Sequence, residues 1–120
     1  MIGLPSSVRI YLAREPADMR NGPDGLARLV RRHFDEDVFS GHLFCFLSKR
    51  RDRAKILWWD HGGFVVYYKR LERSKFRRPA ANAEGQVVLT AAELQSLLEG
   101  IDLAGAHRAR LWQPRSRRAA

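Results

Sequence analysis

The sequence has one cysteine and no long apolar run, and each scarcity excludes a class of protein. The single thiol of Cys45 rules out an internal disulfide and a cysteine-clustered zinc site. Even the longest uninterrupted apolar run is short, as at Leu43–Leu47, and lies far below the roughly 20 residues that a membrane-spanning helix needs. The first five residues show no basic stretch leading into an apolar segment, so we expect no secretory signal and a cytoplasmic location.

Sequence motifs for chemistry are also missing. There is no glycine-rich phosphate loop, and the four histidines show no metal-ligand spacing with one another or with Cys45. We therefore expect no catalytic residue, no metal, no cofactor and no enzymatic activity. The alternative is a metal-dependent nuclease, because carboxylates near phosphate can hold a divalent ion. Its candidates are Asp52, Asp60 and Glu72, with Lys75 as a charge stabiliser.

What is present fits one soluble domain. The chain has 120 residues, of which 45% are apolar and 29% charged, close to the averages for globular proteins. We expect a single domain over residues 1–104, because chains divide only when they are far longer. Residues 105–120 are basic and poor in apolar side chains, so we expect a flexible tail.

The periodicity of apolar residues predicts strands and two helices. Alternation of apolar and polar residues over 8–12 predicts a half-buried strand. Strands are also predicted where β-branched and aromatic residues are frequent, at 43–47, 55–59 and 64–68. Apolar residues at helical spacing predict helices over 24–34 and 91–99. The second helix begins with the capping box Thr90–Glu93. These elements predict an α+β fold: an antiparallel sheet built around a central β-hairpin, with two helices packed against it.

The hairpin is the clearest prediction, since the turn formers of residues 60–63 separate two aromatic-rich runs. Two registers remain open. A His61-Gly62 loop places Trp59 opposite Phe64, and a Gly62-Gly63 loop shifts every pair by one residue. In both registers the hairpin ends near Ala54 and Lys69.

Positive charge is concentrated in one quarter of the chain. The formal net charge is +9, and residues 49–78 hold eleven basic side chains against three acidic ones. Because the hairpin folds back on itself, it brings the clusters at its two ends to one edge of the sheet. The predicted nucleic-acid contacts are Lys49, Arg50, Arg51, Arg53, Lys55, Lys69, Arg70, Arg73, Lys75, Arg77 and Arg78.

Such a patch has two interpretations. A polyanion would relieve the repulsion among crowded like charges, whereas a solvated basic face would only keep the protein soluble. We favour the polyanion, because the clusters flank aromatic residues. The C-terminal basic residues are either an arm that adds phosphate contacts or a frayed terminus.

Adjacent aromatic residues in the hairpin must point to opposite faces of the sheet, since side chains alternate along a strand. This applies to Trp58 and Trp59, and to Tyr67 and Tyr68. One of each pair should face outward. Trp59 and Tyr68 are the candidates for stacking on bases or binding a partner protein.

Several segments in order resemble a known family: residues 18–27, 39–44, 52–60, 68–72 and 98–102. Lys55–Asp60 and Tyr68–Glu72 are the most specific in combination. Over about residues 2–104, the chain resembles the TnpB-type accessory proteins of the bacterial insertion-sequence 66 transposons, the small product of the second reading frame.

The resemblance implies a role in transposition beside a separate transposase, which carries the acidic catalytic residues. The leading hypothesis is a non-catalytic accessory protein that binds DNA, at the transposon ends, through the basic patch. The alternative is a module that binds the transposase without touching DNA. Its anchors would be Trp59 or Tyr68 and the apolar stripe Leu94, Leu97 and Leu98.

Overall fold

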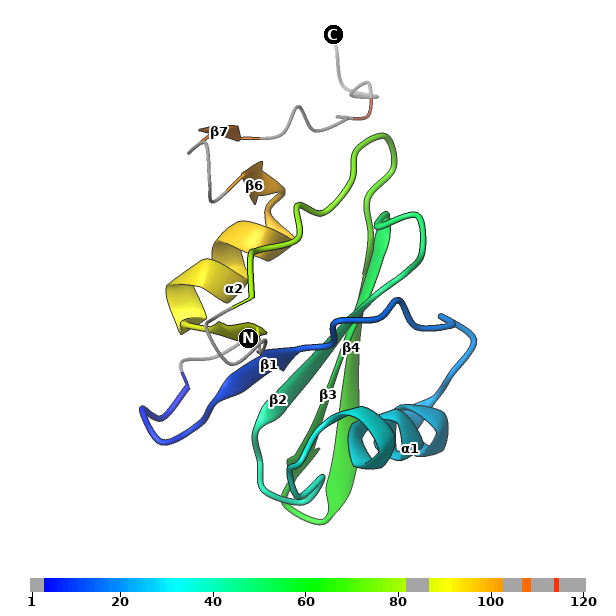
Figure 1. Ribbon diagram of the computed structural model, residues 1–120, viewed down its shortest axis with the longest axis vertical. Coiled ribbons are helices and arrows are strands. Elements are labelled where there is room, and N and C mark those ends of the chain that lie inside the picture. The colour runs from blue at the N-terminus through cyan, green and yellow to red at the C-terminus, as the bar shows by residue number, and fades with distance from the viewer. Residues whose placement is uncertain (1–3, 82–86, 103–106, 109–113, 115–120) are drawn as a thin grey trace, which may run out of the picture.

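The structure is a computed structural model that describes residues 4–81, 87–102, 107–108 and 114 (Figure 1). A five-stranded sheet contains β1 (Ile10–Leu12), β2 (Leu43–Leu47), β3 (Arg53–Asp60), β4 (Gly63–Arg70) and β5 (Val87–Leu89). Two helices, α1 (Pro23–His33) and α2 (Ala91–Leu98), accompany it. The α+β class is therefore confirmed.

The sheet is mixed and not purely antiparallel, which corrects the predicted fold. The strand order is β4-β3-β2-β1-β5, and β1 pairs parallel with β2 while every other pairing is antiparallel. The parallel pair follows from α1, because a helix between two strands crosses over and returns the chain in the same direction. The hairpin β3–β4 lies at one side of the sheet and not at its centre, with β4 as the edge strand.

Each face of the sheet has its own apolar cluster under one helix. Leu94, Leu97 and Leu98 of α2 pack with one cluster, whereas Leu26 and Val30 of α1 pack with the other. Successive residues of β2 alternate between the two clusters, so the helices cover opposite faces. This explains why β1 and β2 are buried along their whole length, where alternation in residues 8–12 had predicted a half-buried strand.

Local signals at the helix ends agree with the structure. Pro23 occupies the first turn of α1, where its missing N–H costs nothing, and Arg31 and Arg32 lie in the last turn, where the helix dipole favours cations. The capping box of α2 is confirmed: Thr90 Oγ1 accepts from Glu93 N at 3.1 Å and Glu93 Oε1 accepts from Thr90 N at 2.9 Å. These ends fix where each helix begins.

The hairpin adopts the first of the two registers. Trp59 pairs with Phe64 and Lys55 with Tyr68, which leaves a two-residue loop. Both loop residues have positive φ, 40° at His61 and 89° at Gly62, as in the tight turns that suit twisted strands. The register places Lys55, Trp59 and their partners on the α1 face of the sheet.

After β4 the chain runs without regular structure along the molecule, held by Leu71 and Phe76, which is fully buried. Beyond α2, β6 (Ile101–Asp102) pairs with β7 (His107–Arg108). The predicted tail, 105–120, lies outside the described residues apart from 107–108 and 114. Among the described residues, neither helix has the length and apolar content to cross a membrane.

Candidate nucleic-acid interface

The two basic segments of the sequence lie side by side in the structure. Arg53 at the start of β3 pairs with Arg70 at the end of β4. Beyond that pair, Leu71 N donates to Asp52 O at 2.7 Å and Phe76 N donates to Arg51 O at 2.6 Å. Backbone hydrogen bonds therefore join the loop before β3 to the segment after β4. We call the surface formed by the basic residues of 49–55 and 69–78 the basic surface.

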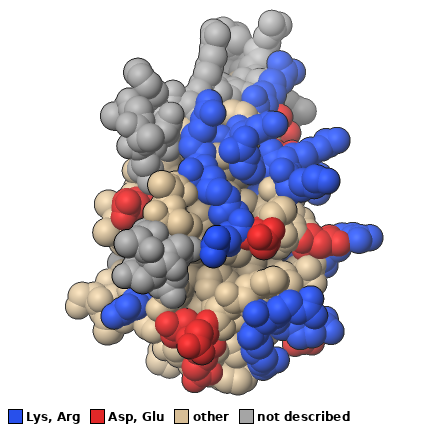
Figure 2. Space-filling view, viewed as in Figure 1, with Lys and Arg blue, Asp and Glu red and all other residues tan. Residues whose placement is uncertain are grey.

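Figure 2 shows many Lys and Arg side chains gathered at the end of the molecule where β4 leads into the following segment. A second group of basic side chains covers the region of α1, and acidic side chains lie between the two groups. Helix α1 carries Arg28, Arg31 and Arg32, and all three are exposed. The charge is thus clustered and not spread evenly over this face.

Six of the eleven predicted cations are exposed and take part in no ion pair within the described part of the chain. They are Lys49, Arg50, Arg51, Arg53, Lys75 and Arg77. Side chains of this kind can contact phosphate at little cost, because no internal bond has to break first. Arg73, in the segment after β4 that also holds Lys75 and Arg77, is exposed as well.

Three other cations bond to backbone carbonyls of distant segments, and a fourth, Arg70, forms an exposed ion pair with Glu72. Lys55 Nζ donates to Asn21 O at 2.8 Å, Lys69 Nζ donates to Leu98 O at 2.7 Å, and both Arg78 Nη atoms donate to Ala13 O at 2.7–2.8 Å. Arg70 is bonded to Glu72 at 3.0 Å, which raises the pKa of its guanidinium. The structure therefore separates six exposed cations that take part in no ion pair with the described residues from four that are bonded within the chain, with Arg73 exposed in the segment after β4.

A cleft opens beside the basic surface and has a volume of about 460 Å³. One wall is the loop before β3 with Lys49 and Arg50, together with Arg53 at the start of β3, and the other is the connector before α1 with Asp18 and Arg20. Tyr68 lines the cleft and is 48% exposed. We call this the basic cleft.

The connector wall carries a paired charge. Asp18 accepts from the Arg20 guanidinium at 2.6 Å and from Arg20 N at 2.9 Å, and these bonds lower the pKa of the Asp18 carboxyl to about 2. Arg20 was not among the predicted contacts. Both residues fall within segment 18–27, one of the segments on which the family resemblance rests. That resemblance is the sequence signal that could have pointed to Arg20.

Trp59 does not lie at the basic surface. It pairs with Phe64 next to the hairpin turn, about 20 Å along the strand from Arg53 at 3.4 Å per residue. Its ring centroid lies 5.0 Å from those of Phe39 and Phe64. Phe39 is 50% exposed and was missed by sequence reasoning, because it lies in a turn-forming stretch without periodicity. These three rings form the aromatic end of the hairpin.

The apolar stripe of α2 was wrongly predicted as a partner-binding anchor. Leu94, Leu97 and Leu98 are buried against the sheet. The helical pattern marked a core-facing surface, as such patterns usually do.

The nuclease alternative gains no support from the carboxylates. Asp52 Oδ1 accepts from Ser48 Oγ at 3.1 Å, Glu72 is bonded to Arg70, and Asp60 lies at the hairpin turn. The described residues contain no group of three or more side chains suited to a metal ion. Cys45 is buried, which raises the pKa of its thiol to about 12 and disfavours the nucleophilic thiolate.

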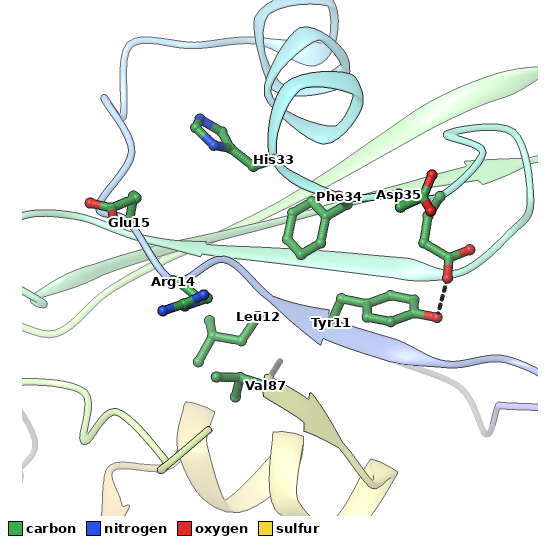
Figure 3. A pocket seen from close by; sticks show the side chains of 9 residues that line it. Tyr11, Leu12, Arg14, Glu15, His33, Phe34, Asp35 and Val87 are labelled. Atoms are coloured by element: carbon green, nitrogen blue, oxygen red, sulfur yellow. Dashed lines mark hydrogen bonds between the residues drawn. The ribbon is translucent and has the colours of Figure 1, made fainter. Parts of the chain in front are cut away.

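A smaller pocket of about 300 Å³ lies between β1, the end of α1 and the start of β5. Figure 3 shows its polar side chains at the rim and Tyr11, Leu12 and Phe34 between them. The Tyr11 hydroxyl donates to Glu36 Oε1 at 2.6 Å, and burial together with this bond raises the pKa of Tyr11. The bond joins β1 to the loop after α1 and so stabilises the fold at this point.

Comparison with known proteins finds a family model and relatives that cover most of the chain. A family model described as "IS66 Orf2 like protein" matches residues 8–108. The uncharacterized protein y4jC of Sinorhizobium fredii is 35% identical over 102 residues, covering 85% of this chain and 86% of that protein. The uncharacterized protein y4hO of the same organism is 34% identical over 113 residues, covering 92% and 96%. No solved structure matches the chain.

Proposed function

The chain belongs to the IS66 Orf2-like protein family, and from this membership we propose that it is a non-catalytic accessory protein of transposition that binds DNA through the basic surface. The family implies an accessory role associated with an insertion sequence. DNA contact, the ends of the transposon as its site and action in the cytoplasm are the parts we add.

The meeting of the two basic segments supports the proposal most strongly. Crowded cations repel one another, and a polyanion relieves that repulsion. Six exposed cations of this surface take part in no ion pair with the described residues, so they are available to phosphates. Phosphate contacts position a protein on DNA without reading its sequence.

The salt dependence of DNA binding tests this proposal. If about five phosphates are contacted, log K falls by roughly 4–5 for each tenfold rise in salt. Replacing Arg50 and Arg53 with Gln should lower that slope by about 1.8. The matched control replaces Arg28 and Arg31 on α1, which changes the net charge equally and should leave the slope unaltered. Fluorescence anisotropy with labelled duplex DNA measures both.

A binding constant that hardly changes with salt would contradict the proposal. Equal losses for the two double variants would also contradict it, because they would show attraction to net charge and not to the basic surface. Comparing transposon-end DNA with unrelated DNA of equal length then tests whether the ends are preferred.

The aromatic end of the hairpin favours a second candidate function, contact with the separate transposase. Aromatic residues, phenylalanine among them, are enriched in protein–protein interfaces relative to the rest of the surface. Phe39, half exposed and packed on Trp59 and Phe64, is such a group. Transposase that co-purifies after nuclease treatment, and is lost with Phe39→Ser, would support this function. Loss only on nuclease treatment would show that DNA bridges the two proteins.

A further inference from the structure

We infer that the basic cleft binds an unpaired nucleotide of single-stranded DNA, its base lying against Tyr68 and its phosphates on the loop before β3. This inference rests on the proposed function and adds the strand state of the DNA. The cleft volume of about 460 Å³ falls within the range of small-molecule sites. Both walls and the aromatic ring come from described residues.

Tyr68 has a positioned neighbour and remains half exposed. Its strand partner Lys55 places Nζ 5.6 Å from the ring centroid, and that ammonium is fixed by its bond to Asn21 O. Nearly half of Tyr68 remains exposed, at 48%, and the residue lines the cleft. A positioned aromatic ring beside cations is the arrangement on which single-stranded nucleic acids stack their bases.

The loop before β3 presents its cations from a compact turn. Ser48 Oγ donates to Asp52 Oδ1 and accepts from Arg53 N, both at 3.1 Å, and Arg51 N donates to Ser48 O at 2.9 Å. These bonds fix the backbone that carries the exposed Lys49 and Arg50. Phosphates bound there would meet a preorganised site, which lowers the entropic cost of binding.

The charges on the two walls of the basic cleft decide on which side the phosphate of the nucleotide lies. The pKa of the Asp18 carboxyl is lowered to about 2 by its bonds to Arg20, so the group is negative at neutral pH. Because Arg20 pairs with this carboxylate, the connector wall carries no net charge, and a phosphate is better placed on the side of Lys49, Arg50 and Arg53, which take part in no ion pair with the described residues. The base is then left to the side chains that can contact a flat ring, Tyr68 and Met19.

Single-stranded DNA fits this geometry better than a duplex. In a duplex each base face is covered by its neighbours, so a ring within a cleft can reach only an unstacked base. The exposed cations outside the cleft, such as Lys75 and Arg77, remain able to contact either form of DNA. Loss of the Tyr68 ring should therefore affect single strands selectively.

The test measures anisotropy of a labelled 12-nucleotide strand and of its duplex with wild-type protein and three variants. Tyr68→Thr keeps a β-forming residue and removes the ring, and Tyr68→Phe keeps the ring. Phe39→Thr is the matched control, because Phe39 is equally exposed but lies at the aromatic end of the hairpin. We expect Tyr68→Thr to weaken single-strand binding at least about fivefold. Tyr68→Phe, Phe39→Thr and all duplex affinities should stay within about twofold.

A strand of the same length that lacks bases provides a readout independent of mutation. Wild-type protein should bind it more weakly than the complete strand, and equal affinities would overturn the inference. Unchanged single-strand binding by folded Tyr68→Thr would also overturn it, leaving the proposed function intact if the salt slope persists. If neither strand nor duplex binds with a salt slope, the proposed function itself fails.

Discussion

Arg77 and Arg78 are neighbours in the sequence, yet replacing each with Met should have opposite effects. Both Nη atoms of Arg78 donate to Ala13 O, within a part-buried site that lowers the pKa of the guanidinium. Arg77 is exposed and has no hydrogen bond or ion pair with the described residues. Methionine preserves much of the aliphatic stem in both variants, so the comparison isolates the charged group.

The magnitude for Arg78→Met follows from the bond that is lost. Removing one partner of a buried hydrogen bond costs about 1–3 kcal/mol, and Ala13 is 4% exposed. At about 4 °C per kcal/mol for a domain of this size, the melting temperature should fall by roughly 4–12 °C. The salt slope of DNA binding should not change, because this guanidinium is already engaged within the fold.

Arg77→Met should show the reverse pattern. Surface substitutions usually alter stability by no more than about 0.5 kcal/mol. Loss of one phosphate contact should lower the salt slope by about 0.9. Thermal unfolding followed by circular dichroism and salt-dependent anisotropy measure the two quantities on the same samples. A stable Arg78→Met with a reduced slope would refute the assignment of Arg78 to the fold.

Two further predictions concern stability and reactivity. Thr90→Ala should lower the free energy of unfolding by about 0.5–2 kcal/mol in urea titrations, whereas Glu93→Gln keeps the capping box and should cost less; equal losses would contradict this role of the hydroxyl. At pH 8, Cys45 with a pKa of about 12 holds roughly a thousandfold less thiolate than at its ordinary pKa of 9.0, so iodoacetamide should modify it only after unfolding. Because its pKa is raised by burial, this protection holds below pH 9 and weakens as the pH approaches 12; rapid labelling of the folded protein would show that Cys45 is accessible.

Local patterns predicted the elements well because their causes are local. The capping box, the proline in the first turn of α1 and the two-residue hairpin loop depend on residues close in sequence. The hairpin likewise brings the ends of the two basic segments together at Arg53 and Arg70, whereas the position of the residues after Leu71 depends on the burial of Phe76. Choosing between the two registers required tertiary packing, because both place aromatic residues on each face.

The sheet order could not be predicted from local patterns. The parallel pairing of β1 with β2 and the return of β5 to the far side of β1 are contacts between distant segments. The α2 stripe was misassigned for the same reason, since an apolar helix face fits a core and a partner equally well. The sequence also did not show which cations bond within the fold. Lys69 bonds to the carbonyl of Leu98, 29 residues away, and Arg78 to that of Ala13, 65 residues away.

The basic surface is part of the fold and not an attached arm, because buried residues hold its second segment. Phe76 is fully buried, and its N–H donates to Arg51 O at 2.6 Å. Leu71, 7% exposed, donates its N–H to Asp52 O at the other end of the same contact. Exposed Lys75 and Arg77 flank Phe76 directly. The apolar anchor therefore opposes the repulsion between the two basic segments, and the concentration of like charge is compatible with a stable domain.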